Sequence, residues 1–391
     1  MAHEVERRWQ GDPGAPGGRR ARASFTYRAF MPDAIAELDP GITFETAEAI
    51  ARAEAAITEL NSTDSVAGLE AVGPLLLRSE AIASSRIEGY ELSQRNLARA
   101  LIDPRAARGT AKTVAANVVA MEEAIAIGER PEPLTADDVL AIHRTLMAGE
   151  PERVRPGQFR REQNWIGGRL NTPLDARFIP PPEDAVDRFI ADLLAFLARD
   201  DVPPVAQAAI GHAQFETIHP FVDGNGRIGR CLIHVVLRRT GLAPRFVPPV
   251  SIVLAARPSS YVDGLVAFRE GRVAAWCASF AGACERAARL SVELAEAVRG
   301  LQEQWRSRAG HPRRDSAAAR IIEVLPAQPI LSAATLRAAI AASHQRSLDG
   351  LKALAGAGVV RQITETSYDR QFAADELFDL IETYEERIAA P

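Results

Sequence analysis

The stretch HPFVDGNGRIGR, from His219 to Arg230, decides the fold of this chain. Gly224 and Gly226 permit backbone conformations that bring N–H groups close to a ligand. A helix is expected directly after them, over about 228–240. A glycine-rich loop that opens a helix is a natural anion site, because free N–H groups and the helix dipole point at it. The stretch therefore predicts a phosphate-sized anion site.

Four side chains of this loop suit a polyphosphate. Arg227 and Arg230 are three residues apart, so they lie on the first helical turn as two cations beside the anion site. Asp223 lies at the mouth of the loop, and one carboxylate plus substrate phosphates is a usual way to hold Mg²⁺. His219 ends the preceding helix, and an imidazole can accept a hydroxyl proton at neutral pH.

This stretch resembles the signature of the Fic family, H-x-F-x-[D/E]-G-N-[G/K]-R-x-x-R, at every defined position. The resemblance covers about residues 25 to 390. It implies a mainly α fold: a Fic-type helical core with a β-hairpin flap, and a C-terminal winged helix-turn-helix domain. It also implies a protein adenylyltransferase, a nucleotidyltransferase that moves AMP from ATP to a protein hydroxyl. Gly226, where Doc-like phosphotransferases carry lysine, favours AMP transfer over phosphorylation.

The resemblance implies a role for each position of the motif. His219 is the general base that deprotonates the target hydroxyl, and Asp223 binds Mg²⁺ or Mn²⁺. Arg230 engages the γ-phosphate of ATP, and Phe221 packs the loop onto the core. Tyr261 resembles a position near the nucleoside pocket, with a core tyrosine as the alternative. The residues that hold the phosphates are Gly224, Asn225, Gly226 and Arg227.

A second motif, Ser84-x-x-x-Glu88-Gly89, matches the inhibitory pattern [S/T]-x-x-x-E-[G/N] of the same family. Ser84 and Glu88 are four residues apart, so they share one helix face. By resemblance, Glu88 pairs with Arg230 and occupies the space of the γ-phosphate, which makes the enzyme autoinhibited. Some members use this glutamate to remove AMP, so de-AMPylation is an alternative activity. A surface glutamate near a helix end is the other interpretation.

Residues from about Asn164 to Ile179 break the helical pattern. A short apolar run, a glycine pair, a second short run and several prolines predict a β-hairpin or an extended flap. By resemblance this flap docks the target, because an exposed strand edge can pair with an extended segment. The implied partners are ATP and a protein with a Tyr, Thr or Ser hydroxyl. A plain surface hairpin is the alternative.

The C-terminal residues predict a helix-turn-helix followed by a two-stranded wing. Seven basic and three acidic residues lie between Arg313 and Arg361, in a chain whose net charge is −5. Basic residues such as Arg346 and Lys352 lie along the expected recognition helix, which supports DNA binding, although this Ala-rich helix offers few side chains that read bases. The alternatives are protein docking and a homodimer. A transcription regulator whose Fic domain acts as a sensor is therefore the competing function.

Composition divides the rest of the chain. The glycine, proline and arginine content of the N-terminus predicts a mobile segment, and helical periodicity resumes after it. The predicted divisions are a flexible arm at 1–24, an N-terminal helical region with the inhibitory helix at 25–110, a Fic catalytic core at 111–300, a linker at 301–315 and a winged-helix domain at 316–391.

Composition also indicates where the protein works. Three cysteines, Cys231, Cys277 and Cys284, fall in helix-like runs, which favours reduced core thiols in a cytoplasmic protein. We see no signal peptide and no run of about 18 apolar residues, so no membrane span is expected. The pI of about 5.9 argues against a general polyanion binder.

Overall fold

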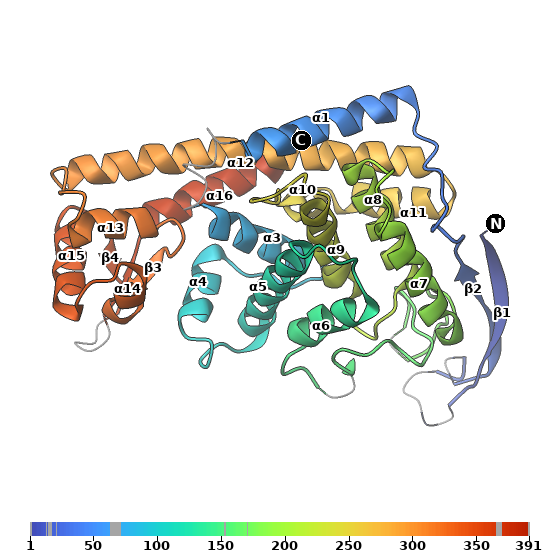
Figure 1. Ribbon diagram of the computed structural model, residues 1–391. Coiled ribbons are helices and arrows are strands. Elements are labelled where there is room, and N and C mark those ends of the chain that lie inside the picture. Colours follow the sequence, from blue (N-terminus) through green and yellow to red (C-terminus); the bar gives the residue numbers. More distant parts are fainter. Residues whose placement is uncertain are drawn as a thin grey trace. The chain divides into compact units, whose positions relative to one another are not determined.

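Figure 1 shows the computed structural model, which describes residues 2–12, 14, 18–20, 22–62, 72–151, 154–169, 171–364 and 370–389. The described chain is mainly helical, as the sequence predicted. It forms two compact units, each built from three separate stretches. The first unit comprises Met1–Ile50, Val119–Thr240 and Val262–Ala281, and the second comprises Ala51–Val118, Gly241–Tyr261 and Gly282–Pro391.

The first unit is built around α8 (Pro204–Ile218) and α9 (Asn225–Arg239), which pack against each other (Figure 1). Every residue of α8 after Pro204 is buried, and so is α9 from its start through Leu237. Helices buried on all sides belong to a core rather than to a surface. α7 (Val186–Leu197) covers α8, and α6 (Ala136–Leu146) packs against α9. The loop between α8 and α9 therefore has a rigid support.

The start of α6 follows from its sequence. The Thr135 hydroxyl accepts the Asp138 N–H at 3.2 Å, and the Asp138 carboxylate accepts the Thr135 N–H at 2.9 Å. This reciprocal capping box satisfies two N–H groups that the helix leaves without partners. Thr135 is therefore the N-cap of α6.

The first unit also contains a hairpin of β1 (His3–Trp9) and β2 (Phe25–Met31), paired antiparallel along their whole length. Strand β1 differs from the flexible arm predicted for residues 1–24. Residues 1, 13, 15–17 and 21 of that segment lie outside the described residues. Contacts far along the chain explain the difference. Trp9 lies edge-on to Trp165 with ring centroids 5.5 Å apart, and Arg7 pairs with Asp184 at 3.0 Å.

The second unit holds α3 (Gly73–Ile87), which has Pro74 in its first turn and is followed by Gly89 with φ of 84°. α10 (Val250–Ala256) packs against α3, where Ser251 donates its N–H to the Glu80 carboxylate at 2.8 Å. α4 (Gln94–Ile102) follows α3 in the chain and packs against it. The helix that carries Ser84 is therefore a well-packed element of this unit.

The C-terminal module has three helices and a three-stranded antiparallel sheet in the order β3-β5-β4. The helices and the β4–β5 hairpin are the elements that the sequence predicted, and β3 is an addition. The winged-helix assignment and its DNA partner stay predictions, and residues 365–369 of the wing lie outside the described residues. The elements are α13 (Ala317–Val324), β3 (Ile330–Ser332), α14 (Ala333–Ala339), α15 (His344–Gly356), β4 (Arg361–Gln362) and β5 (Gln371–Ala373).

Several helices have residues in both units. They are α1 (Phe44–Leu60), α5 (Gly109–Gly128), α11 (Pro258–Arg269) and α12 (Val273–Arg308). The last of these corrects the predicted linker at 301–315, since the helix continues through Arg308. Tertiary contacts explain the extension: Gln302 donates to the Ile322 carbonyl at 2.9 Å, and the Trp305 indole donates to Glu376 at 2.6 Å.

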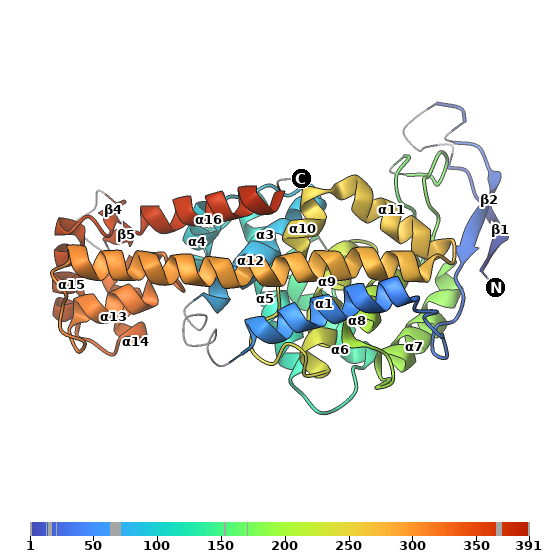
Figure 2. The ribbon, with the colours of Figure 1, turned by 90° about the horizontal axis from the view of Figure 1, so that it is seen from above.

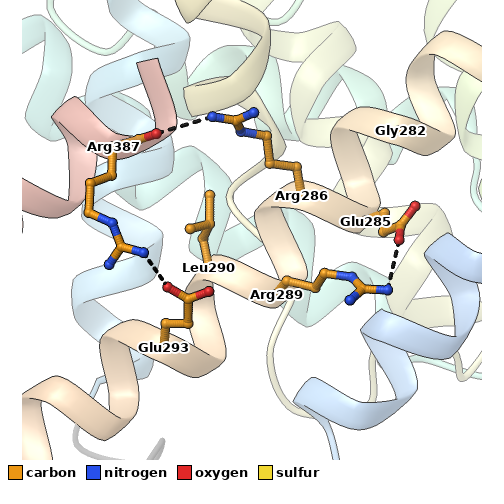
Figure 3. Close-up of a pocket in the computed structure, with 7 residues that line it drawn as sticks. All are labelled: Gly282, Glu285, Arg286, Arg289, Leu290, Glu293 and Arg387. Carbon is orange, nitrogen blue, oxygen red and sulfur yellow. Dashed lines mark hydrogen bonds and ion pairs between the residues drawn. The ribbon is translucent and has the colours of Figure 1, made fainter. Parts of the chain in front are cut away.

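Within the second unit, α12 runs beside α16 (Asp375–Ala389) (Figure 2). A cavity of about 450 Å³ lies between them, and charged side chains that bind one another line it (Figure 3). Arg387 pairs with Glu293 at 2.6 Å, and Arg286 donates to the Arg387 carbonyl at 3.1 Å. One ion pair and one hydrogen bond to a carbonyl thus join α16 to α12 at this cavity.

The three cysteines are buried, and none forms a disulfide. Cys231 and Cys277 belong to the first unit, and Cys284 belongs to the second. Burial raises the pKa of the Cys277 thiol to about 12 and raises the pKa of the Cys284 thiol as well. The prediction of core thiols is confirmed. Among the helices that the structure describes, none is long and apolar enough to cross a membrane.

Candidate functional site

The main chain of His219 is in an unusual conformation. It caps α8 with φ of 50° and ψ of 59°, the left-handed region, and donates its N–H to the Phe215 carbonyl at 2.9 Å. A residue with a Cβ pays about 1–2 kcal/mol there, so its surroundings must hold it. The helix therefore ends at the predicted base, as the sequence indicated.

Arg160 is the first element of that support. Its side chain is fully buried, and its Nε donates to the His219 carbonyl at 2.9 Å. Its two Nη groups donate to the carbonyls of Glu162 at 3.0 Å and Pro181 at 2.6 Å. Burial lowers the pKa of Arg160 to about 10, but these carbonyls provide the acceptors that a buried guanidinium needs.

Asn164 is the second element. Its Nδ2 donates to the His219 carbonyl at 3.0 Å and to the Phe221 carbonyl at 2.9 Å. Between these two, the Pro220 carbonyl accepts the main-chain N–H of Arg160 at 2.8 Å. The short segment before and at the start of the flap thus holds the first three residues of the motif.

The underside of the loop rests on α6. Phe221 is buried, as predicted, and stacks on His143 with ring centroids 3.7 Å apart and planes 5° from parallel. The Nδ1 of His143 accepts the Gly157 N–H at 2.9 Å, so its Nε2 carries the proton and donates to the Asp223 carbonyl at 3.1 Å. Burial lowers the pKa of His143 to about 4, which keeps this ring neutral.

Gly224 and Asn225 shape the turn itself. Gly224 has φ of 81°, a conformation that favours glycine, and a Cβ there would lie 2.2 Å from the Met147 methyl, which would have to move. Asn225 is buried, and its side chain accepts the Phe221 N–H at 2.8 Å and donates to the Phe221 carbonyl at 2.9 Å. α9 begins at Asn225, earlier than the sequence indicated, so Gly226 lies inside the first helical turn.

The charged residues of the motif differ in exposure. Arg227 and Arg230 are 2% and 1% exposed, so both side chains are buried. Asp223 has a side chain that is 53% exposed and lies 3.5 Å from an Nη2 of Arg227. One open carboxylate beside a helix start fits Mg²⁺ that keeps most of its ligands as water and phosphate. No group of three or more candidate metal ligands occurs among the described residues.

Glu216 is a further acidic group at the site. Its Oε2 lies 3.9 Å from the Nδ1 of His219, and both side chains are largely buried. The two are three residues apart, a spacing that puts residues on one helix face and was the available sequence signal for Glu216. His143 and Arg160 had no comparable signal, because their partners lie far along the chain.

The remaining predicted site residues belong to the second unit. Tyr261 is 7% exposed on α11, and Ser84 is fully buried on α3. Glu88 is the C-cap of α3 and has an exposed side chain. The motif residues from His219 to Arg230 thus lie in the first unit, and these three residues belong to the second.

The flap is a short antiparallel pair, as predicted. Ile166 donates its N–H to the Phe178 carbonyl at 2.8 Å and accepts the Arg177 N–H at 2.8 Å. Arg269 lies over the Phe178 ring, 4.1 Å from its centroid. Residue 170 of the flap lies outside the described residues.

Two sequence profiles match this chain: Fic/DOC family N-terminal over residues 47–126 and Fic/DOC family over residues 133–237. Among curated proteins it is 35% identical over 118 residues to protein adenylyltransferase Fic of Drosophila willistoni, and 29% identical over 125 residues to protein adenylyltransferase fic-1 of Caenorhabditis elegans. These matches cover 29% and 31% of this chain, but only 22% and 23% of the relatives.

Solved structures extend the likeness. A Fic family protein from Desulfovibrio desulfuricans G20 matches with a TM-score of 0.54 and 25% identity, over 85% of this chain and 96% of that one. A Fic domain containing signaling protein from Bacteroides thetaiotaomicron shares the fold, with a TM-score of 0.53 and 19% identity over 64% of this chain and 97% of that one. Residues 47–126 and 133–237 of this chain thus match the Fic/DOC N-terminal region and the Fic/DOC domain in succession, and the fold of a Fic family protein is followed over most of the chain.

Proposed function

We propose that this chain transfers AMP from ATP to a hydroxyl side chain of a target protein, and of itself. The observation that carries the proposal is the complete motif from His219 to Arg230, on a loop held between two buried helices. The names of the curated relatives support the same chemistry. Gly226, which adds no side chain to the phosphate site, favours AMP over phosphoryl transfer.

In this proposal the residues act mainly by position and charge. The His219 imidazole takes the proton of the target hydroxyl, whose oxygen forms a bond to the α-phosphorus of ATP. The bond from that phosphorus to the β-phosphate oxygen breaks, and pyrophosphate leaves. N–H groups at the start of α9 hold the phosphates, while Arg227 and Arg230 balance their charge. Asp223 would hold Mg²⁺ or Mn²⁺, which supplies further positive charge when bound.

Further parts of the proposal rest on the family resemblance. Tyr261 contacts the nucleoside, the flap docks the target, and Glu88, supported by Ser84, restrains transfer. A cytoplasmic location is proposed from the three buried cysteines, none of which forms a disulfide.

The test uses ATP labelled at the α-phosphate or at the γ-phosphate. We expect protein-bound label from the α-labelled form only. His219→Ala should lower that transfer by about 10²–10⁴-fold, the usual contribution of a positioned base, while ATP still binds. Label that arrives from the γ-phosphate alone would establish phosphoryl transfer instead, and equal transfer by His219→Ala would remove the base from the mechanism.

A further inference from the structure

The carbonyls of His219, Pro220 and Phe221 all point at one short segment. Each accepts a hydrogen bond from Arg160 or Asn164. These hydrogen bonds fix the orientation of the three carbonyl groups at the start of the motif. Asn164 differs from Arg160 because it is also the first residue of the flap. It joins the flap directly to the residue that carries the imidazole.

From this connection we propose that Asn164 is a positioning residue for His219. The inference rests on the proposed function and adds a residue to it. A target hydroxyl held along the flap and a base held by the flap's first residue keep a fixed separation. The amide of Asn164 sets that separation through the main chain of His219, without touching substrate.

The orientation of the amide supports this assignment. Both partners of Asn164 are carbonyls, so only Nδ2 can face them, and Oδ1 faces away. Oδ1 is buried and has no hydrogen-bond partner among the described residues, so nothing there competes for the amide. His219 has φ of 50°, a strained conformation for a residue with a Cβ, so loss of the hydrogen bonds that hold its carbonyl lets its main chain relax and redirects the imidazole.

Asn164 also separates positioning from folding better than Arg160 does. The Arg160 side chain is fully buried and serves carbonyls of several segments, so its removal leaves a cavity and several carbonyls without donors. Asn164 is only half-buried and serves two carbonyls of one loop. Its replacement therefore disturbs the loop more than the unit as a whole.

The experiment compares Asn164→Asp and Asn164→Leu with the full-length parent. Both keep the approximate shape of asparagine and lose the N–H donors. Transfer from α-labelled ATP gives kcat and KM for ATP, in the natural chain and in a Glu88→Gly background. We expect kcat to fall by roughly 10–100-fold in both variants, the range that a displacement of up to 1 Å produces. KM for ATP should stay within about twofold in Asn164→Leu, because the phosphate-holding groups are untouched.

Arg161→Ala is the matched control. Arg161 is adjacent to Arg160, but its side chain is exposed and pairs with Asp187 at 2.8 Å, away from the motif. We expect unchanged kcat in this variant. The imidazole signal of His219 in a proton–carbon NMR spectrum, assigned by its absence in His219→Ala, should move in the Asn164 variants and stay in place in Arg161→Ala.

The outcomes are distinct. If Asn164→Asp keeps parental kcat, or if both variants lose thermal stability in proportion to kcat with no shift of the His219 signal, Asn164 merely packs and the inference is overturned. If Asn164→Leu does not fold, Asn164→Asp alone decides. A parent that transfers no label from ATP would instead contradict the proposed function.

Discussion

The neutral state of His143 makes the loop sensitive to acid. Its pKa is lowered from 6.5 to about 4 by burial, so the unfolded chain binds a proton more readily than the folded one between these values. The contribution of neutral His143 to the free energy of unfolding is therefore fully present above pH 6.5, and it is lost as the pH falls toward 4. A shift of this size corresponds to about 3 kcal/mol at most.

The prediction is measured by chemical unfolding between pH 7 and pH 4.5. We expect His143→Gln to lose stability less steeply with falling pH than the natural chain, although it starts from a lower value. The exposed His344, changed to Gln, is the control and should leave the slope as it was. Equal slopes for all three proteins would mean that His143 does not carry the dependence.

Residue types and spacing were enough to predict the motif positions, because each is defined by a neighbour in sequence. His143 could not be predicted in this way, since its role depends on Gly157 and Asp223, which are brought to it only by the fold. The turn signals of the sequence placed Asn164 in the flap. Its hydrogen bonds to the motif could not be predicted, because only the fold brings these distant residues together.

Among the elements, α3 carries the proposed brake at its C-terminal end. We expect Glu88→Gly to raise transfer to the protein itself by roughly 10–100-fold, because the carboxylate no longer competes with the γ-phosphate of ATP and the α-phosphorus can align. The measurement is incorporation of label from α-labelled ATP. Since Glu88 is exposed, the change should alter the free energy of unfolding by only about 0.5 kcal/mol.

Glu91→Gly provides the comparison, because Glu91 is another exposed glutamate just beyond the end of α3. It should leave transfer unchanged. Activation by both substitutions would point to a general loosening of this segment rather than to one carboxylate. No activation by Glu88→Gly, together with a working His219-dependent transfer, would return Glu88 to an ordinary helix end.

α16 contributes to the second unit through Phe378, which is 1% exposed and belongs to a cluster with Ala98 of α4, Ile330 and Ala373. Phe378→Ala should lower the free energy of unfolding by about 3–5 kcal/mol, the usual effect of removing a large buried aromatic side chain. Urea unfolding measures the loss. The exposed Phe44, at 85% exposure, serves as the same substitution without burial and should cost little when changed to Ala. Similar losses at both positions would contradict this packing.

Elements that were predictable have local signals, such as the Thr135 capping box of α6 and Pro74 in the first turn of α3. Those that were not depend on distant partners. β1 needs β2 and Trp165, and the last turns of α12 need Ile322 and Glu376. Composition alone therefore suggested an arm and a linker.

At the scale of the whole molecule, the sequence suggested consecutive divisions, whereas each compact unit is assembled from three separate stretches. Periodicity along the chain reports which face of a helix is buried, but not which later segment covers it. The motif itself was predictable because all of its residues fall in one stretch of the first unit. The composition of the unit that surrounds the motif was not predictable, because its three stretches are far apart in the sequence.

The buried cysteines have a kinetic consequence. A thiol reagent attacks the thiolate, so Cys231, Cys277 and Cys284 can react only after the structure around each has opened. Two of these thiols belong to the first unit and one to the second, so their labelling rates measure how often each unit opens. We expect very slow labelling in native buffer, and mass spectrometry with peptide mapping should show Cys284 modified at its own rate if the units open separately. Phe378→Ala should then speed up labelling of Cys284 alone, whereas equal acceleration at all three sites would mean that the chain opens as one cooperative body.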